Sequence, residues 1–166
     1  MVSHITHERA ATRAVLDAFR RIVQAIRESS RDAERRVGLS GAQLFVLQTV
    51  AEQPGLSMND LAEATHTHQS SVSVVVSRLI RARSLERTTA ASDGRRAEIR
   101  LTALGRRRLA RAPHTAQGRL VAAVNGLGLR ERRRLAASLE LIVRRMALER
   151  QRAGMFFEGR ERKARA

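Results

Sequence analysis

Residues 57–80 read SMNDLAEATHTHQSSVSVVVSRLI and predict two helices separated by a short polar break. Ser57 followed by Asp60 is a capping-box signature, so a short helix is expected from Met58 to about Thr65. The break is Thr65-His66-Thr67-His68, and a second helix is expected from there to about Arg83. Aliphatic residues recur in it at helical spacing, which predicts one buried side. They are Val72, Val75, Val76, Leu79 and Ile80.

The pattern after this pair of helices changes from helical to alternating. Leu85–Thr88 and Glu98–Thr102 are short strand candidates, and Ser92-Asp93-Gly94-Arg95 between them is rich in turn residues. We therefore expect a β-hairpin with a projecting loop. Two helices joined by a tight turn and followed by a hairpin are the order of a winged helix-turn-helix, in which the second helix enters the major groove of DNA.

Two helices are expected before this unit. The pattern is helical from about Thr6 to Arg36, with Val15, Phe19, Ile22, Val23 and Ile26 three and four residues apart. Ser40 with Gln43 forms a second capping box, and the helix that it opens stops at Pro54-Gly55.

Two more helical segments follow the hairpin. Thr102 is placed to cap a long helix, and Pro113 inside that helix should kink it or split it in two, because proline removes a backbone donor. The last helix is expected from about Leu129 to Gln151. Its residues Leu135, Leu139, Ile142 and Met146 alternate four and three apart, which is the seam of two packed helices.

The charge indicates a polyanionic partner. The chain has 32 Lys+Arg against 16 Asp+Glu, and Lys163 is its only lysine. A GC-rich genome would also enrich arginine, so placement matters more than the total. Between Gln69 and Arg108 lie ten arginines and three acids, a net charge of +7 in 40 residues. The arginines are Arg78, Arg81, Arg83, Arg87, Arg95, Arg96, Arg100, Arg106, Arg107 and Arg108. Nucleic acid is the first candidate.

Other classes of function find little support. The chain has no cysteine, which excludes disulfides and thiolate metal sites. It shows no signal peptide and no apolar run of about 20 residues, so a cytoplasmic protein is expected. It also shows no nucleophile elbow, phosphate-binding glycine loop or paired catalytic carboxylates. We expect neither an enzyme nor a cofactor.

Several motifs together resemble the multiple-antibiotic-resistance regulator (MarR) family. They are Leu39-Ser40-x-x-Gln43-x-x-Val46-Leu47, Ser57-x-x-Asp60-Leu61-Ala62, Ser71-Val72-Ser73 to Leu79, and Asp93-x-Arg95-Arg96-x-x-Ile99-x-Leu101-Thr102-x-x-Gly105. The last block matches the wing signature of that family, and the blocks cover about Leu39 to Gly105.

The resemblance implies a mainly α fold, an α+β winged helix-turn-helix whose terminal helices form a dimerisation layer. Residues 1–36 would be the N-terminal dimerisation helix, 37–104 the DNA-binding lobe, 105–151 the C-terminal dimerisation helices and 152–166 a basic, flexible tail. The dimer interface would include Val15, Leu135, Leu139, Ile142 and Met146.

The resemblance further implies that a homodimer binds a pseudo-palindromic operator, usually as a repressor that a small phenolic or other ligand releases. Arg95 would enter the minor groove, and Arg96 would support the wing or touch phosphate. Asp93 has a structural role as an alternative, since it is placed to pair with Arg87 or Arg96. The full set of expected DNA contacts is Gln69, Ser70, Ser71, Ser73, Val74, Ser77, Arg78, Arg87, Arg95 and Arg96.

The chain departs from the family pattern after the recognition helix, where Arg83-Ser84 stands in place of the usual Gly-Leu. Glycine relieves a left-handed helix end. Arg83 must therefore adopt that conformation at some cost in free energy, or the helix must end differently.

An effector pocket between the dimerisation layer and the lobe would take an aromatic acid. The residues expected near it are Phe19, Ile22, Ile26, Phe45, His66, His68 and His114. For Phe19, Ile22 and Phe45 the alternative is an ordinary core position, and for His66 and His68 a place in the turn. A metal site of Glu63, His66, His68 and His114 is a less favoured alternative.

Two further functions compete with that of a ligand-responsive regulator. One is a nucleoid-type protein that uses the same basic surface without a specific operator. The other is lipid binding by the arginine-rich tail, whose apolar side is short for that role. Footprinting separates the regulator from the nucleoid-type protein.

Overall fold

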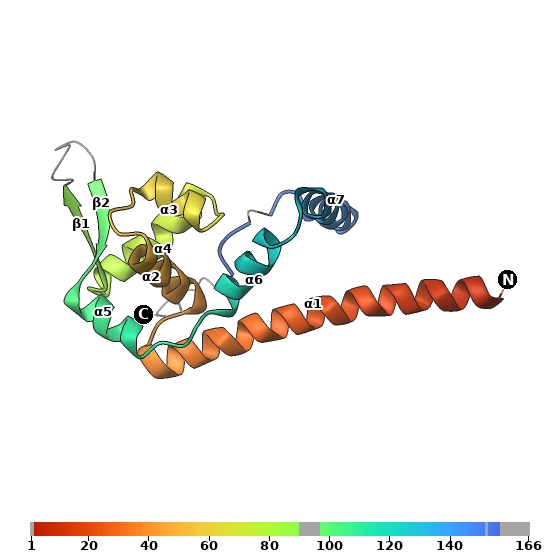
Figure 1. The fold of residues 1–166 in the computed structure, drawn as a ribbon, viewed down its shortest axis with the longest axis horizontal. Coiled ribbons are helices and arrows are strands. Elements are labelled where there is room, and N and C mark those ends of the chain that lie inside the picture. The colour runs from red at the N-terminus through yellow and green to blue at the C-terminus, as the bar shows by residue number, and fades with distance from the viewer. Residues whose placement is uncertain (1, 90–96, 152, 157–166) are drawn as a thin grey trace, which may run out of the picture.

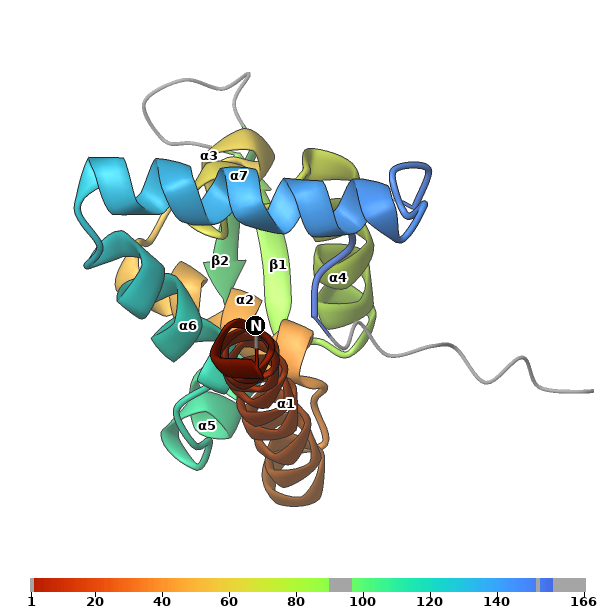
Figure 2. The same ribbon diagram turned by 90° about the vertical axis from the view of Figure 1, so that its right-hand side faces the viewer.

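The computed structural model describes residues 2–89, 97–151 and 153–156, with only the helical path given for residues 2–6. The elements in chain order are α1 (Val2–Val37), α2 (Gly41–Glu52), α3 (Met58–Ala64), α4 (Gln69–Arg81), β1 (Leu85–Thr89), β2 (Ala97–Leu101), α5 (Ala103–Ala110), α6 (Ala116–Asn125) and α7 (Leu129–Arg145). The elements from α2 to α5 form one lobe, from which α1 projects as a long arm (Figure 1). Figure 2 looks along α1 and shows α7 running across the molecule.

The capping signals in the sequence place the helix starts. The Ser40 hydroxyl accepts from the backbone N–H of Gln43, and the Gln43 side chain accepts from the backbone N–H of Ser40. Ser57 and Asp60 form the same reciprocal pair at the start of α3. The two capping boxes predicted from the sequence are confirmed.

The core of the lobe is aliphatic. Its fully buried side chains come from the inner faces of α2, α3 and α4 and from both strands. They are Leu39, Leu44, Val46, Leu47, Val50, Leu61, Val72, Val75, Val76, Leu79, Leu85 and Ile99. Fully burying one such side chain stabilises the fold by about 1.5–3 kcal/mol, so this set fixes how α4 sits against α2 and α3.

The hairpin is attached to the core at its base. Strands β1 and β2 pair antiparallel, with Leu85 opposite Leu101 and Arg87 opposite Ile99. The backbone N–H of Ile99 also donates to the carbonyl oxygen of Leu56 at 2.9 Å, which ties the hairpin to the segment before α3. The mainly α winged helix-turn-helix predicted from the sequence is confirmed.

The helices after the hairpin differ in part from the expected ones. Pro113 splits the long helix into α5 and α6, which is one of the two predicted outcomes. The prediction that the last helix reaches Gln151 was wrong. Helix α7 ends at Arg145, because Ala147 turns into the left-handed region at φ 53°.

Helix α1 is buried only where it meets the lobe. Ile26 and Ala33 lie in the interior, and the Ser30 hydroxyl accepts from the backbone N–H of Gly41 at 3.0 Å. Near the end of α1, hydrogen bonds from Arg36 and Arg35 lower the pKa of the Asp32 carboxyl below its usual value. No helix in the described part of the chain has the length and apolar character needed to cross a bilayer.

Candidate nucleic-acid interface

Helix α4 has one buried and one exposed side. Val72, Val75, Val76 and Leu79 face the core. On the other side, Gln69, Ser70, Val74, Ser77 and Arg81 are exposed, and Ser71, Ser73 and Arg78 are half-buried. Ser70 and Ser77 among the exposed residues are short and polar, so a flat partner such as the floor of a DNA groove can approach the helix backbone closely there.

The turn before α4 sets the orientation of this helix relative to α3. His66 adopts φ 49°, its N–H donates to the Glu63 carbonyl, and the N–H of Thr67 donates to that of Ala62. His68 caps α4 through its backbone and makes no side-chain capping bond. The first N–H groups of α4 therefore lack a side-chain cap, and the positive end of a helix in that state favours a phosphate.

Ser73 is already engaged within the helix. Its hydroxyl donates to the Ser70 carbonyl oxygen at 2.9 Å. The Ser73 oxygen keeps its acceptor capacity, so an amino group on a base edge can still donate to it.

The strands of the wing carry basic residues next to α4. Arg87 on β1 is exposed. Arg100 on β2 is held by Glu98, whose Oε2 accepts from its Nε at 3.0 Å and from its Nη2 at 2.7 Å. Of the two, Arg87 is the better placed to meet a phosphate. The predictions for Asp93, Arg95 and Arg96 fall outside the described residues.

The end of α4 shows how the chain manages without the expected glycine. Arg83 does adopt the left-handed conformation, with φ 54°. Arg108 on α5 donates from Nη1 to the Ala82 carbonyl at 3.2 Å and to the Ser84 hydroxyl at 2.6 Å. The Thr102 hydroxyl donates to the Arg83 carbonyl at 2.6 Å. These contacts satisfy the two carbonyl groups that follow α4 and connect the end of this helix to the base of the wing.

Arg108 is the residue whose role the sequence did not reveal. Its position in an arginine run suggested a phosphate contact, but its guanidinium serves the end of α4. The polar Ser84 in place of leucine was the available signal, because a buried hydroxyl needs a partner.

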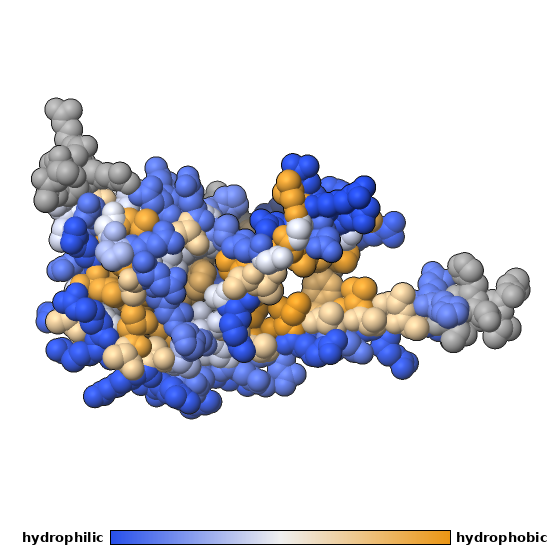
Figure 3. Space-filling model, viewed as in Figure 1, coloured by the Kyte–Doolittle hydropathy of each residue, from blue (hydrophilic) through white to orange (hydrophobic). Residues whose placement is uncertain are grey.

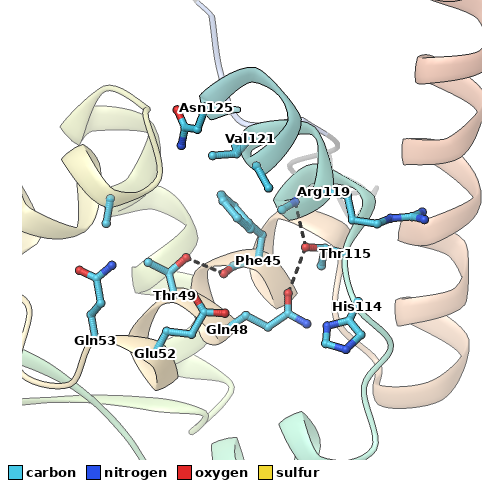
Figure 4. Close-up of a pocket in the computed structure, with 13 residues that line it drawn as sticks. Phe45, Gln48, Thr49, Glu52, Gln53, His114, Thr115, Arg119, Val121 and Asn125 are labelled. Atoms are coloured by element: carbon cyan, nitrogen blue, oxygen red, sulfur yellow. Dashed lines mark hydrogen bonds between the residues drawn. The ribbon is translucent and has the colours of Figure 1, made fainter. Parts of the chain in front are cut away.

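A pocket of about 800 Å³ lies between α2 and α6 (Figure 4). Phe45 and Val121 form its apolar part, and Gln48 closes one side through a bond from the Thr115 hydroxyl to its Oε1 at 3.0 Å. His114 and Arg119 lie at the edge, with Arg119 extending away from Phe45 (Figure 4). Such a pocket suits an apolar ligand with one polar group.

The seven residues predicted for an effector pocket do not converge in this chain. Phe45 and His114 line the pocket between α2 and α6, whereas His66 and His68 line a second pocket. Phe19 and Ile22 are exposed on α1, and Ile26 is buried. Among the described residues, no three histidine, aspartate or glutamate side chains gather as metal ligands would.

The helix-turn-helix, its outward second helix and the basic hairpin together define a winged-helix lobe. The model of the MarR family matches residues 37–96, which cover the lobe from α2 to β1 but not β2 and α5. Over these residues the chain is therefore similar to MarR family proteins, as the sequence motifs indicated.

Solved structures with the same fold include the following three. One is a MarR family transcription regulator, with TM-score 0.54, 20% identity and coverage of 87% of this chain and 97% of that chain. Bordetella bronchiseptica BpsR gives TM-score 0.52, 24% identity and coverage of 82% and 91%. S. aureus MepR bound to DNA gives TM-score 0.51, 23% identity and coverage of 78% and 94%. No curated protein sequence matches the chain.

Proposed function

We propose that this chain is a homodimeric, sequence-specific DNA-binding regulator of transcription that represses its target and is released by a small ligand. The observation that carries the proposal is the exposed side of α4, where Gln69, Ser70 and Ser77 are exposed, together with the exposed Arg87 on the neighbouring strand β1. A helix so presented fits the major groove, with the wing over the adjoining minor groove. The solved MepR complex contains DNA, which supports this choice of partner.

The case for a homodimer comes from apolar surface that the single chain leaves uncovered. The face of α1 that is buried at Ile26 continues outward as Phe19, Ile22 and Val15, the last 49% exposed. On α7, Leu135, Leu139, Ile142 and Met146 are exposed as well. Figure 3 shows apolar residues along the side of α1 that faces α6 and α7. Soluble monomers seldom expose apolar surface of this extent, so a second copy is expected to cover it.

The pocket between α2 and α6 is the proposed effector site. This pocket lies between the lobe and the helices that would form the dimer layer. A ligand bound in it would therefore change the distance between the α4 helices of the two subunits. Arg119 and His114 at its edge supply cationic or donor groups for an acid. BpsR, whose DNA binding is regulated by 6-hydroxynicotinic acid, is a similar fold with an aromatic acid as effector.

The test is fluorescence anisotropy with a labelled duplex taken from upstream of the protein's own gene. Ser77→Asp adds a negative charge to the exposed side of α4 and should weaken binding roughly tenfold or more. Ala110→Asp, at an exposed position on α5, is the matched control and should bind like the wild type. Equal affinity for the wild type and Ser77→Asp would contradict the assignment of α4.

Arg95→Ala should also weaken binding without dissociating the dimer, as the wing motif predicts.

A further inference from the structure

A second pocket lies on the other side of α6, away from the proposed effector site. Its cavity is about 800 Å³. Gln117, Leu120 and Val121 of α6 line it together, because residues three and four apart share a helix face. Gly118, Ala122 and Asn125 turn toward the first pocket. The two cavities are therefore distinct, although Val121 borders both.

The C-terminal segment closes this second pocket. The chain returns from α7 to the lobe, where Met155 is 5% exposed and belongs to the core cluster. Ala153, Gly154 and Phe156 line the cavity beside it. The opposite wall is the turn between α3 and α4, including His66 and His68. An occupant would thus touch the segment that precedes the recognition helix.

One polar group in the wall lacks a partner. Gln117 is 6% exposed, and its Oε1 has no hydrogen bond within the described part of the chain. An unsatisfied buried amide oxygen is unfavourable, because it has lost its hydrogen bonds to water and gained none in return. The terminal torsion of glutamine is soft, so this amide can turn its oxygen toward a donor in the cavity.

The lining also indicates the charge of the ligand. Of the described residues that line the cavity, only Glu63 carries a formal charge when the histidines are neutral, and none is an arginine. That differs from the first pocket, where Arg119 offsets the charge of Glu52. The aromatic rings of Phe156, His66 and His68 favour a flat molecule.

We infer that this cavity is a second small-molecule site, selective for a flat, apolar, uncharged or cationic compound whose N–H donates to Gln117 Oε1. The compound stacks among Phe156, Met155 and the turn histidines. It differs in charge from the acid proposed for the first pocket, so the two sites take different ligand classes.

Indole and 1-methylindole test the inference, because they differ in the one N–H donor. The chain has 4 methionines, which are Met1, Met58, Met146 and Met155. With ¹³C-methyl methionine, indole should shift the Met155 resonance saturably and leave those of Met58 and Met146 in place. Met155→Leu assigns the resonance. 1-Methylindole should bind about three- to tenfold more weakly, as expected for one lost hydrogen bond.

Gln117→Leu should abolish this preference for indole, whereas Arg119→Gln, its neighbour in the other pocket, should retain it. The inference is overturned if Met155 does not respond up to the solubility limit of indole, or if wild-type protein binds both compounds equally. The comparison of indole with 1-methylindole uses only the wild-type protein, so it tests the inference even if Gln117→Leu fails to fold. The titration contains no DNA, so its result is independent of the proposed function.

Discussion

Backbone strain at the end of α4 is concentrated in one residue. Arg83 holds φ 54°, a region that is unfavourable by roughly 1–2 kcal/mol for a residue with a side chain. Arg108 and Thr102 hold the adjoining carbonyls and keep Arg83 in this conformation. The sequence predicted the strained position correctly, but the residues that support it lie about 20 positions away, and the neighbouring Ser84 was the one local signal for them.

Arg83→Gly should therefore stabilise the protein by roughly 0.5–1 kcal/mol, because the relief of strain exceeds the entropy that glycine loses on folding. The free energy of unfolding from urea denaturation measures this. Ala82→Gly is the control, since Ala82 has φ −78° and gains no relief. It should destabilise by roughly 0.5–1 kcal/mol. A loss of stability in Arg83→Gly would refute the strain assignment.

Gly105 is required for a different reason, which is that the backbone at Ser84 lies too close to leave room for a side chain. A Cβ at this position would overlap the Ser84 carbonyl oxygen, which is part of the backbone. We expect Gly105→Ala to destabilise the lobe by about 1–3 kcal/mol in the same denaturation assay. Gly126→Ala, whose Cβ would meet nothing nearer than 3.4 Å, should be neutral or slightly stabilising. Equal stabilities for the two variants would show that α5 can move away from Ser84.

At the scale of elements, local signals in the sequence predicted helix starts better than helix ends. Ser40, Ser57 and Thr102 each cap a helix as expected. Helix α7 ends early because Ala147 turns left-handed, without the glycine or asparagine that usually marks such an end.

The candidate site was predictable where one helix carries it and less so where distant segments meet. The spacing of Val72, Val75 and Val76 determined which side of α4 is exposed. The two pockets depend on how α6 and the C-terminal segment pack against α2 and α3. Met155 falls in the segment predicted to be a basic tail, but it is buried in the core. The apolar run Met155-Phe156-Phe157 was the one local signal for that contact, and it says nothing about where on the lobe the segment packs.

The exposed seam of α7 predicts where the dimer can be broken. Leu139→Glu combined with Ile142→Glu would place two charges in the proposed interface, so the protein should become monomeric and lose tight DNA binding. Sedimentation velocity measures the mass. Ala137→Glu, which lies on the opposite side of α7, should remain dimeric. If the doubly substituted protein also sediments as a dimer, the interface lies elsewhere.

For the whole molecule, the net charge of +16 governs how binding responds to salt. Two lobes that together neutralise six or more phosphates should lose about 10³-fold in affinity between about 50 and 200 mM salt. Titrations of the upstream duplex at several salt concentrations give the slope. A slope near zero would mean that the arginines of the wing do not meet phosphate.

The central claim is that two copies of the chain place their α4 helices in successive major grooves of one DNA site. Footprinting on the DNA upstream of the gene tests it most directly. We predict one protected pseudo-palindrome whose half-sites are centred about one helical turn apart, or a whole multiple of it, and which persists at moderate salt. Uniform protection that disappears as salt is added, or no protection at all, would contradict the claim.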